Sequence, residues 1–155
     1  EQRVGGFFSS RSYHDHDHDH HRYCIRTSGS PPTTIPTDPA QVAVFGGTNL
    51  ETQDGHTEWI EGRVHQDGFT TTFTPNQKTP FTSSGVIYDV DYTSAEEGDS
   101  ATAITYAAVT SRSYHTGIVQ SLLMDGSARS ISNNIDLGVW RALGTRNGSE
   151  IVGEF

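Results

Sequence analysis

Short runs of β-forming residues recur between turn residues from position 41 onward, whereas only one segment has the apolar spacing of a helix. The turn residues between the runs make this pattern typical of an antiparallel β protein. The predicted strands are 41–45, 59–64, 69–74, 86–92, 102–110 and 117–124. We therefore predict an α+β domain made mainly of antiparallel β-structure.

The strand predicted at 86–92 alternates between apolar and polar positions. One face carries Val86, Tyr88, Val90 and Tyr92, and the other carries Ile87, Asp89 and Asp91. This alternation predicts a half-buried strand whose two aspartates project from the solvent-exposed face.

A β-hairpin is predicted where the run 117–124 meets Asp125-Gly126 and a second run at 127–131. The Asp-Gly pair accepts the positive φ angles of a type I′ turn. The first strand is apolar on both faces, which predicts a central strand with Leu122 or Leu123 buried in the core.

The one predicted helix is short and covers about residues 136–143. Asp136 can cap its N-terminus, Ile135 can pack on Trp140 as a staple, and Gly144 offers a stop. We expect this C-terminal helix to pack on the β-structure through its apolar face.

Residues 1–40 differ in composition from the rest of the chain, because glycine, serine, histidine, aspartate, proline and threonine dominate them. Valine, isoleucine, leucine and phenylalanine number 9 in residues 1–58 and 22 in residues 59–155. We therefore predict an arm or loop region at 1–40 and a β-rich domain at 41–155.

Charge and cysteine content exclude several classes of partner and cofactor. The chain has 155 residues, of which 10 are basic and 19 acidic, and its formal net charge is −9. Nucleic acid and anionic lipid surfaces attract positive charge, so neither is an expected partner. Cys24 is the only cysteine, which excludes an intrachain disulfide, a four-thiolate metal site and an iron–sulfur cluster.

A tract of alternating histidine and aspartate occupies residues 14–21. In an extended conformation, alternation places four histidines on one side of the chain, namely His14, His16, His18 and His20. Neutral imidazoles suit zinc or copper, so the tract is a candidate transition-metal site. The alternative is a solvated low-complexity loop that binds metal only adventitiously.

A second group of candidate ligands is acidic and consists of Asp89, Asp91, Glu96 and Glu97. Calcium takes several oxygen ligands, and a strand end followed by an acidic turn can supply them. The segment lacks the spacing and the internal glycine of an EF-hand loop, so a solvated acidic loop is the competing interpretation.

The sequence predicts no active site. His115 and Asp125 could form a base and its orienting carboxylate, but ten extended positions span about 33 Å, so the two cannot touch along one strand. There is also no nucleophile elbow, no P-loop and no His-Glu-x-x-His helix. We therefore expect the protein not to be an enzyme.

Several residues from His115 to the C-terminus form a recognisable signature. His115 is followed after nine residues by Asp125-Gly126-Ser127, then by Trp-Arg-Ala-Leu-Gly-Thr-Arg at 140–146, Glu150 and Gly-Glu-Phe at 153–155. This signature resembles that of the large planctomycete family of pilin-like proteins of unassigned function, relatives of the major pseudopilin of type II secretion. Upstream, the segments 56–59, 62–66, 73–76, 89–91 and 105–114 are also similar to that family.

The resemblance covers about residues 55–155 and has two departures. The family usually has Pro-Gly-Gly after the histidine, where this chain has Thr-Gly-Ile at 116–118. The strand after Asp-Gly usually carries valine and phenylalanine, where this chain has Ala128 and Ser130.

The resemblance implies a pilin-like globular headgroup that lacks the apolar N-terminal helix with which such proteins usually begin. The implied function is that of a structural, non-catalytic subunit of a cell-surface or envelope assembly of type IV pilin-like or pseudopilin-like kind. Its implied partners are copies of itself or other pilin-like subunits, with membrane attachment only through the missing helix. The implied location is extracellular, at the cell surface or in the periplasm.

The resemblance also implies a calcium site, because major pseudopilins hold calcium near their C-terminal strands, which supports the hypothesis for Asp89 and Asp91. Two functions from other classes stay open. One is a secreted metal-binding protein that uses the tract at 14–21, and the other is a hydrolase whose site is not evident in the sequence.

Deleting residues 14–21 is expected to abolish zinc uptake and to leave thermal stability nearly unchanged, because no flanking apolar residues would bury the tract. Isothermal titration with zinc and thermal unfolding of both chains measure the two effects. A large loss of stability in metal-free buffer would show instead that the tract packs against the domain.

Overall fold

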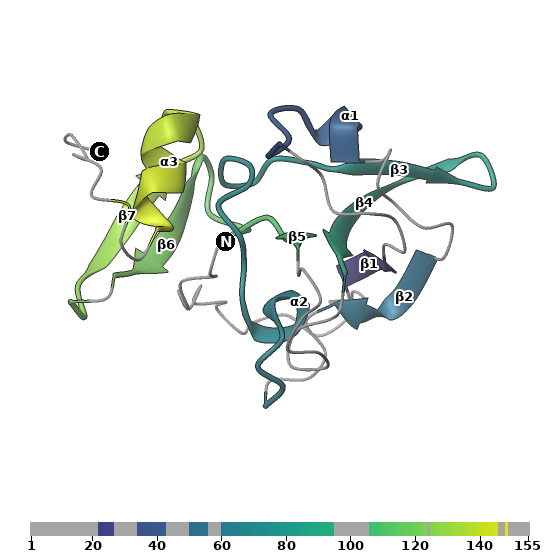
Figure 1. Ribbon diagram of the computed structural model, residues 1–155, viewed down its shortest axis with the longest axis horizontal. Helices are drawn as coiled ribbons and strands as arrows, with labels where there is room; N and C mark the ends of the chain where they lie inside the picture. The colour runs from purple at the N-terminus through teal and green to yellow at the C-terminus, as the bar shows by residue number, and fades with distance from the viewer. Residues whose placement is uncertain are drawn as a thin grey trace.

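The computed structural model describes residues 22–26, 34–42, 50–55, 60–94, 106–123, 125–145 and 148. These residues form an α+β structure in which most strand pairs are antiparallel and helices are few and short (Figure 1). Among the helices of the described residues, none has the length and apolar character needed to cross a membrane. The predicted fold class is confirmed at this level.

The larger sheet has the strand order β2-β1-β4-β3. Strand β5 also pairs with β4, at residues beyond those that pair with β3. Its strands are β1 (Arg22–Arg26), β2 (Leu50–Gly55), β3 (Pro80–Ser83), β4 (Val86–Thr93) and β5 (Ala107–Ala108). The β1–β4 pair is parallel, and the other pairs are antiparallel. Strand β4 is therefore the element that holds this sheet together.

Strand β1 corrects the predicted boundary between an arm at 1–40 and a domain that begins at 41. Residues Arg22–Arg26 lie between β2 and β4, and Cys24 and Ile25 are fully buried. The sequence signal is weak because the strand is short, begins and ends with arginine and pairs in parallel with a strand far along the chain. This part of the supposed arm belongs to the core.

Strand β4 confirms the prediction at 86–92, but its burial changes along its length rather than from face to face. Val86 and Ile87 are exposed, whereas the last four residues, from Val90 to Thr93, are all buried. Only this second half is flanked by β1 on one side and β5 on the other. The buried Asp91 therefore contradicts the prediction of a solvent-facing aspartate.

A second unit consists of the antiparallel strands β6 (Ile118–Leu122) and β7 (Ala128–Ser132) and the helix α3 (Leu137–Leu143), which lies against them in Figure 1. A turn at Asp125-Gly126 is confirmed, with Gly126 at φ +84° and the Leu123 N–H donating to the Ser127 carbonyl at 2.8 Å. The predicted type I′ geometry is wrong, because Asp125 does not have the positive φ that this turn type requires. The predicted helix is also confirmed, since Asp136 Oδ1 accepts the Val139 N–H at 3.0 Å.

The predicted burial of this hairpin is wrong. Leu122 is 39% exposed and Leu123 is half-buried, whereas Val119 and Ile131 are the buried apolar residues. In the described residues β6 pairs with β7 alone, so it is not a central strand. The α3 helix covers one face of the hairpin, and only the side chains of that face are buried.

Replacing Ile131 by alanine is therefore expected to lower the free energy of unfolding by about 2–5 kcal/mol, as for other buried large-to-small substitutions. Leu122→Ala, on the open side of the same hairpin, is expected to cost under about 1 kcal/mol. Urea denaturation of both variants measures the difference. Equal losses would contradict the observed orientation of the hairpin.

Three predicted strands are not strands over their described residues. Residues 41 and 42 belong to α1 (Pro39–Val42), and the run 59–64 leads into α2 (Val64–Asp67). The run 69–74 forms bends with a single bridge from Thr70 to Thr110. Of the run predicted at 102–110, the described part contains β5 and that bridge.

Two apolar clusters form the core. The first core contains Ile25, Val42, Phe73, Val90, Tyr92 and Ala108. The second core contains Val64, Phe69, Val109, Val119, Ile131 and Trp140. Ala108 and Val109 are adjacent but belong to different cores, because successive residues of an extended chain point in opposite directions. The segment after β5 therefore separates the two cores.

Candidate functional site

The two aspartates of the predicted calcium group are ion-paired to an arginine that the sequence analysis missed. Arg112 contacts both carboxylate oxygens of Asp89, with Nη1 to Oδ2 at 2.8 Å and Nη2 to Oδ1 at 2.9 Å. Its Nη2 also lies 3.8 Å from Asp91 Oδ1. Arg112 thus lies between two carboxylates, and its single positive charge balances only one of the two negative charges.

Backbone N–H groups complete this cluster. Asp89 Oδ1 accepts the Thr79 N–H at 2.8 Å, and Asp91 Oδ1 accepts the Thr110 N–H at 3.3 Å. The Asp91 side chain is 1% exposed, so its charge is held inside the protein by these contacts. The arrangement ties β4 to the segment that follows β5.

The calcium hypothesis stays a prediction. Of its four residues, the structure describes Asp89 and Asp91, and their carboxylates already bind Arg112 and backbone donors. Glu96 and Glu97 lie outside the described residues, as does the tract with His14, His16, His18 and His20. Within the described ranges, no group of three or more histidine, cysteine, aspartate or glutamate side chains is placed to hold a metal ion.

Asn76 fixes the loop that carries Arg112. Its backbone has φ +59°, its N–H donates to the Ser111 carbonyl at 2.8 Å, and its Oδ1 accepts the Ser113 N–H at 2.8 Å. Its Nδ2 also donates to Asn133 Oδ1 at 2.8 Å, which joins this loop to the end of β7. Asparagine tolerates the left-handed conformation better than most residues, which explains its use here.

The signature residues His115, Asp125 and Gly126 do not form one site. His115 is exposed and precedes β6, whereas Asp125 and Gly126 form the turn that follows it. Asp125 Oδ1 accepts the Ser127 hydroxyl at 2.7 Å and the Ser127 N–H at 2.9 Å, and these hydrogen bonds lower the pKa of Asp125. The carboxylate therefore stabilises the turn.

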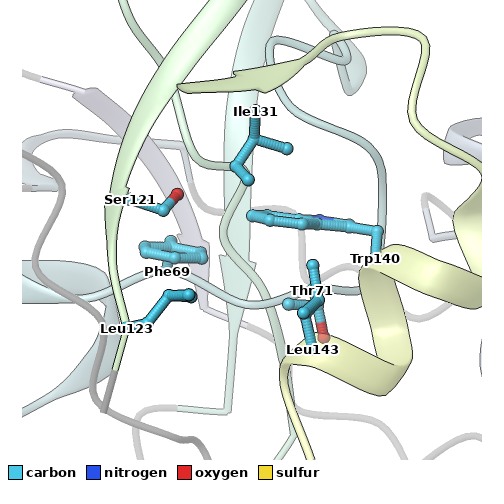
Figure 2. Close-up of a pocket in the computed structure, with 7 residues that line it drawn as sticks. All are labelled: Phe69, Thr71, Ser121, Leu123, Ile131, Trp140 and Leu143. Carbon is cyan, nitrogen blue, oxygen red and sulfur yellow. The ribbon is translucent and has the colours of Figure 1, made fainter. Parts of the chain in front are cut away.

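A small hollow lies in the second core, as Figure 2 shows. Its lining residues are Phe69, Thr71, Ser121, Leu123, Ile131, Trp140 and Leu143. The hollow measures about 10 Å³, room for about one water molecule. Ser121 Oγ is buried there without a hydrogen-bond partner, but none of the lining side chains is a general acid or base. The hollow therefore lacks the groups of a catalytic pocket.

Tyr92 carries a buried hydroxyl in the first core, and this hydroxyl has no hydrogen-bond partner. Desolvation by burial raises the pKa of Tyr92 from its usual 10.0 to about 12. Between these two pH values the unfolded chain has lost this proton while the folded chain keeps it. Stability contributed by Tyr92 is therefore complete below about pH 10 and is lost as the pH rises toward about 12.

Replacing Tyr92 by phenylalanine is expected to reduce the loss of stability between pH 10.0 and about 12. At pH 7 the change should cost less than about 1 kcal/mol, because it removes an unpartnered polar group. Denaturation curves at a series of pH values measure both effects. Tyr114→Phe, at a residue that is 92% exposed, is the matched control and should change stability at pH 7 by less than about 0.5 kcal/mol.

The exposed side of the β3–β4 hairpin is a described surface suited to a partner. Pro80, Thr82 and Ile87 form this hairpin face, since the register places Thr82 opposite Ile87 and all three residues are exposed. The segment 79–88 contains no charged residue, although the whole chain carries a net charge of −9. Figure 1 shows the hairpin projecting past β1 and β2.

Comparison of the chain with protein-family models, with curated proteins and with solved structures finds no match. Two features of the structure bear on function: the hydrogen bonds and backbone conformation of Asp125 and Gly126 in the hairpin turn, and the uncharged hairpin face.

Proposed function

We propose that this domain is the outward-facing, non-catalytic head of a pilin-like subunit in a cell-surface or envelope assembly. The proposal rests on the resemblance of residues 55–155 to pilin-like proteins and on the way in which the structure uses the signature residues. An outward-facing head needs a solvated exterior, which suits the acidic character of the chain.

The use of the signature residues is the observation that carries the proposal. Gly126 adopts a positive φ in the hairpin turn, and Asp125 accepts two hydrogen bonds from Ser127. Trp140 fills the second core, and Arg141 donates to the carbonyl oxygens of Pro36 and Thr72 at 2.6 and 2.8 Å. Residues with these tasks maintain a shape, as a structural subunit requires.

The hairpin face supplies the second supporting observation. An assembly subunit needs a surface that a neighbour can cover, and uncharged residues with exposed apolar side chains suit such contacts. Ile87 is 73% exposed at the projecting end of β4, next to Thr82 of β3. The adjacent charge of Asp89 is compensated by Arg112.

Imaging of cells that make the complete gene product, with a label against this domain, tests the proposal directly. We expect the label on filaments or in clusters at the cell surface or envelope. A diffuse signal in the cell interior would contradict the proposal.

A broad hydrolase screen of the isolated chain tests the rival enzymatic function. We expect no turnover, because the signature residues Asp125, Gly126 and Trp140 are used to build the fold. Turnover that disappears in a His115→Ala variant would overturn the proposal, since His115 is exposed and its replacement should leave the fold intact.

A further inference from the structure

The register of the β3–β4 hairpin leaves Ile87 with backbone groups that β3 does not use. The Val90 N–H donates to the Thr79 carbonyl at 3.0 Å, which identifies a hydrogen-bonded pair at the base of the hairpin. Bonded and non-bonded pairs alternate along an antiparallel ladder, so Thr82 and Ile87 form a non-bonded pair. The Ile87 N–H and C=O therefore point away from β3.

The opposite edge of β4 is open at the same residue. Strand β1 pairs with β4 only from Val90 to Thr93, and no other described strand lies along this edge at residues 86–89. The Ile87 side chain is 73% exposed. This half of β4 is thus a sheet edge that another strand can join.

We propose that this edge pairs with the same edge of a second copy of the chain, antiparallel and about a two-fold axis at Ile87. In that geometry each Ile87 N–H donates to the Ile87 carbonyl of the other copy, so that both open backbone groups are satisfied. The inference rests on the proposed function, because it names the partner and the contact of the assembling head.

The charge distribution favours a second copy as the occupant. Two chains with a net charge of −9 repel each other over most of their surfaces, but the segment 79–88 has no charge and permits close approach. The β4 edge at 86–89 also lacks the lysine, proline or bulge with which proteins usually block such edges, and its one charged residue, Asp89, is paired with Arg112. Self-pairing is therefore opposed less at this edge than at an edge with uncompensated charges.

The proposed contact between two copies is small, and its small area limits the affinity of the dimer. A pairing limited to the end of one hairpin buries much less area than the roughly 1,200–2,000 Å² of a stable interface. The isolated chain is therefore monomeric at micromolar concentration and dimerises only at high concentration. In an array of subunits, the raised local concentration would favour this weak contact.

Disulfide trapping tests the geometry. Opposed residues of a hydrogen-bonded antiparallel pair have Cα atoms about 5.5 Å apart, within the range of a disulfide. Ile87→Cys is expected to form a covalent dimer at least about tenfold faster than Ile60→Cys at near-millimolar concentration. The two residues are matched, with Ile87 73% and Ile60 77% exposed, and Cys24 is fully buried in both variants.

Sedimentation velocity over a range of concentrations supplies the second test. Ile87→Lys places two ammonium groups face to face, so the dissociation constant should rise by about tenfold or more. Ile60→Lys makes the same change in net charge elsewhere and should have no such effect. Added salt should strengthen dimerisation of the wild-type chain, because it screens the repulsion between acidic copies.

Three results would overturn the inference: a wild-type chain that stays monomeric up to millimolar concentration, equal cross-linking of the two cysteine variants, or equal weakening by the two lysine variants. The first would mean that the edge is covered by something other than a second copy. These outcomes leave the proposed function standing, because that proposal is judged by imaging of cells.

Discussion

Replacing Trp140 by alanine is expected to lower the free energy of unfolding by about 3–5 kcal/mol. The indole is 2% exposed and stacks on Phe69, with 5.8 Å between the ring centroids. Its Nε1–H donates to the Phe73 carbonyl oxygen at 2.8 Å, which joins the second core to the first. The substitution leaves a cavity in one core and an unsatisfied acceptor at the edge of the other.

Chemical denaturation followed by far-ultraviolet circular dichroism measures this loss. Trp140→Phe keeps an aromatic ring but removes the donor, so a loss of about 1–3 kcal/mol is expected. Tyr114→Ala, at a residue that is 92% exposed, should change stability by less than about 0.5 kcal/mol. A loss below about 1 kcal/mol for Trp140→Ala would contradict the burial of the indole in the second core.

Replacing Arg112 by alanine is expected to cost a similar amount, about 3–5 kcal/mol, for an electrostatic reason. The substitution leaves Asp91, whose side chain is 1% exposed, without the positive charge that lies 3.8 Å from its Oδ1. It also removes the two-point contact with Asp89. Urea denaturation at neutral pH measures the loss.

A double-mutant cycle separates charge from packing in this cluster. Asp91→Asn in the Arg112→Ala background removes the buried charge, so it should restore part of the lost stability. Arg112→Lys keeps a charge but loses the planar two-point geometry, and its loss should be intermediate. If Asp91→Asn restored nothing, the loss in Arg112→Ala would come from packing alone.

The cluster also bears on the calcium hypothesis. A cation that binds both aspartates must compete with Arg112, which already contacts both carboxylate oxygens of Asp89. This competition raises the cost of a calcium site at the described carboxylates compared with an open acidic loop. The role of Asp89 and Asp91 that the structure shows is to bind Arg112 and the Thr79 and Thr110 N–H groups.

The sequence predicted those elements that depend on interactions between residues close together in the chain. The turn at Asp125-Gly126 depends on the conformational freedom of one glycine and on hydrogen bonds within three residues. The α3 helix begins where Asp136 caps its first turn, and β4 forms over the run of β-forming residues at 86–92, although its burial does not follow their alternation. In each case the residues that decide the structure are neighbours in the sequence.

Gly144 ends α3 as predicted, but the need for glycine there comes from tertiary packing. Its φ is −82°, which any residue can adopt. A Cβ atom there would lie 2.6 Å from Thr71 Cγ2. Glycine is needed because a segment some 70 residues earlier in the chain packs against the end of the helix.

What the sequence by itself determined is the α+β class, the strand at 86–92, the C-terminal hairpin and the helix after it. Tertiary structure alone decided that Arg22–Arg26 is a core strand, that Asp91 is buried beside Arg112, and that Ile87 remains at an open sheet edge. Burial depends on which distant segments flank a strand, and alternation within the strand does not specify those segments. The candidate contact surface therefore became visible only once β1, β3 and β5 had their places along β4.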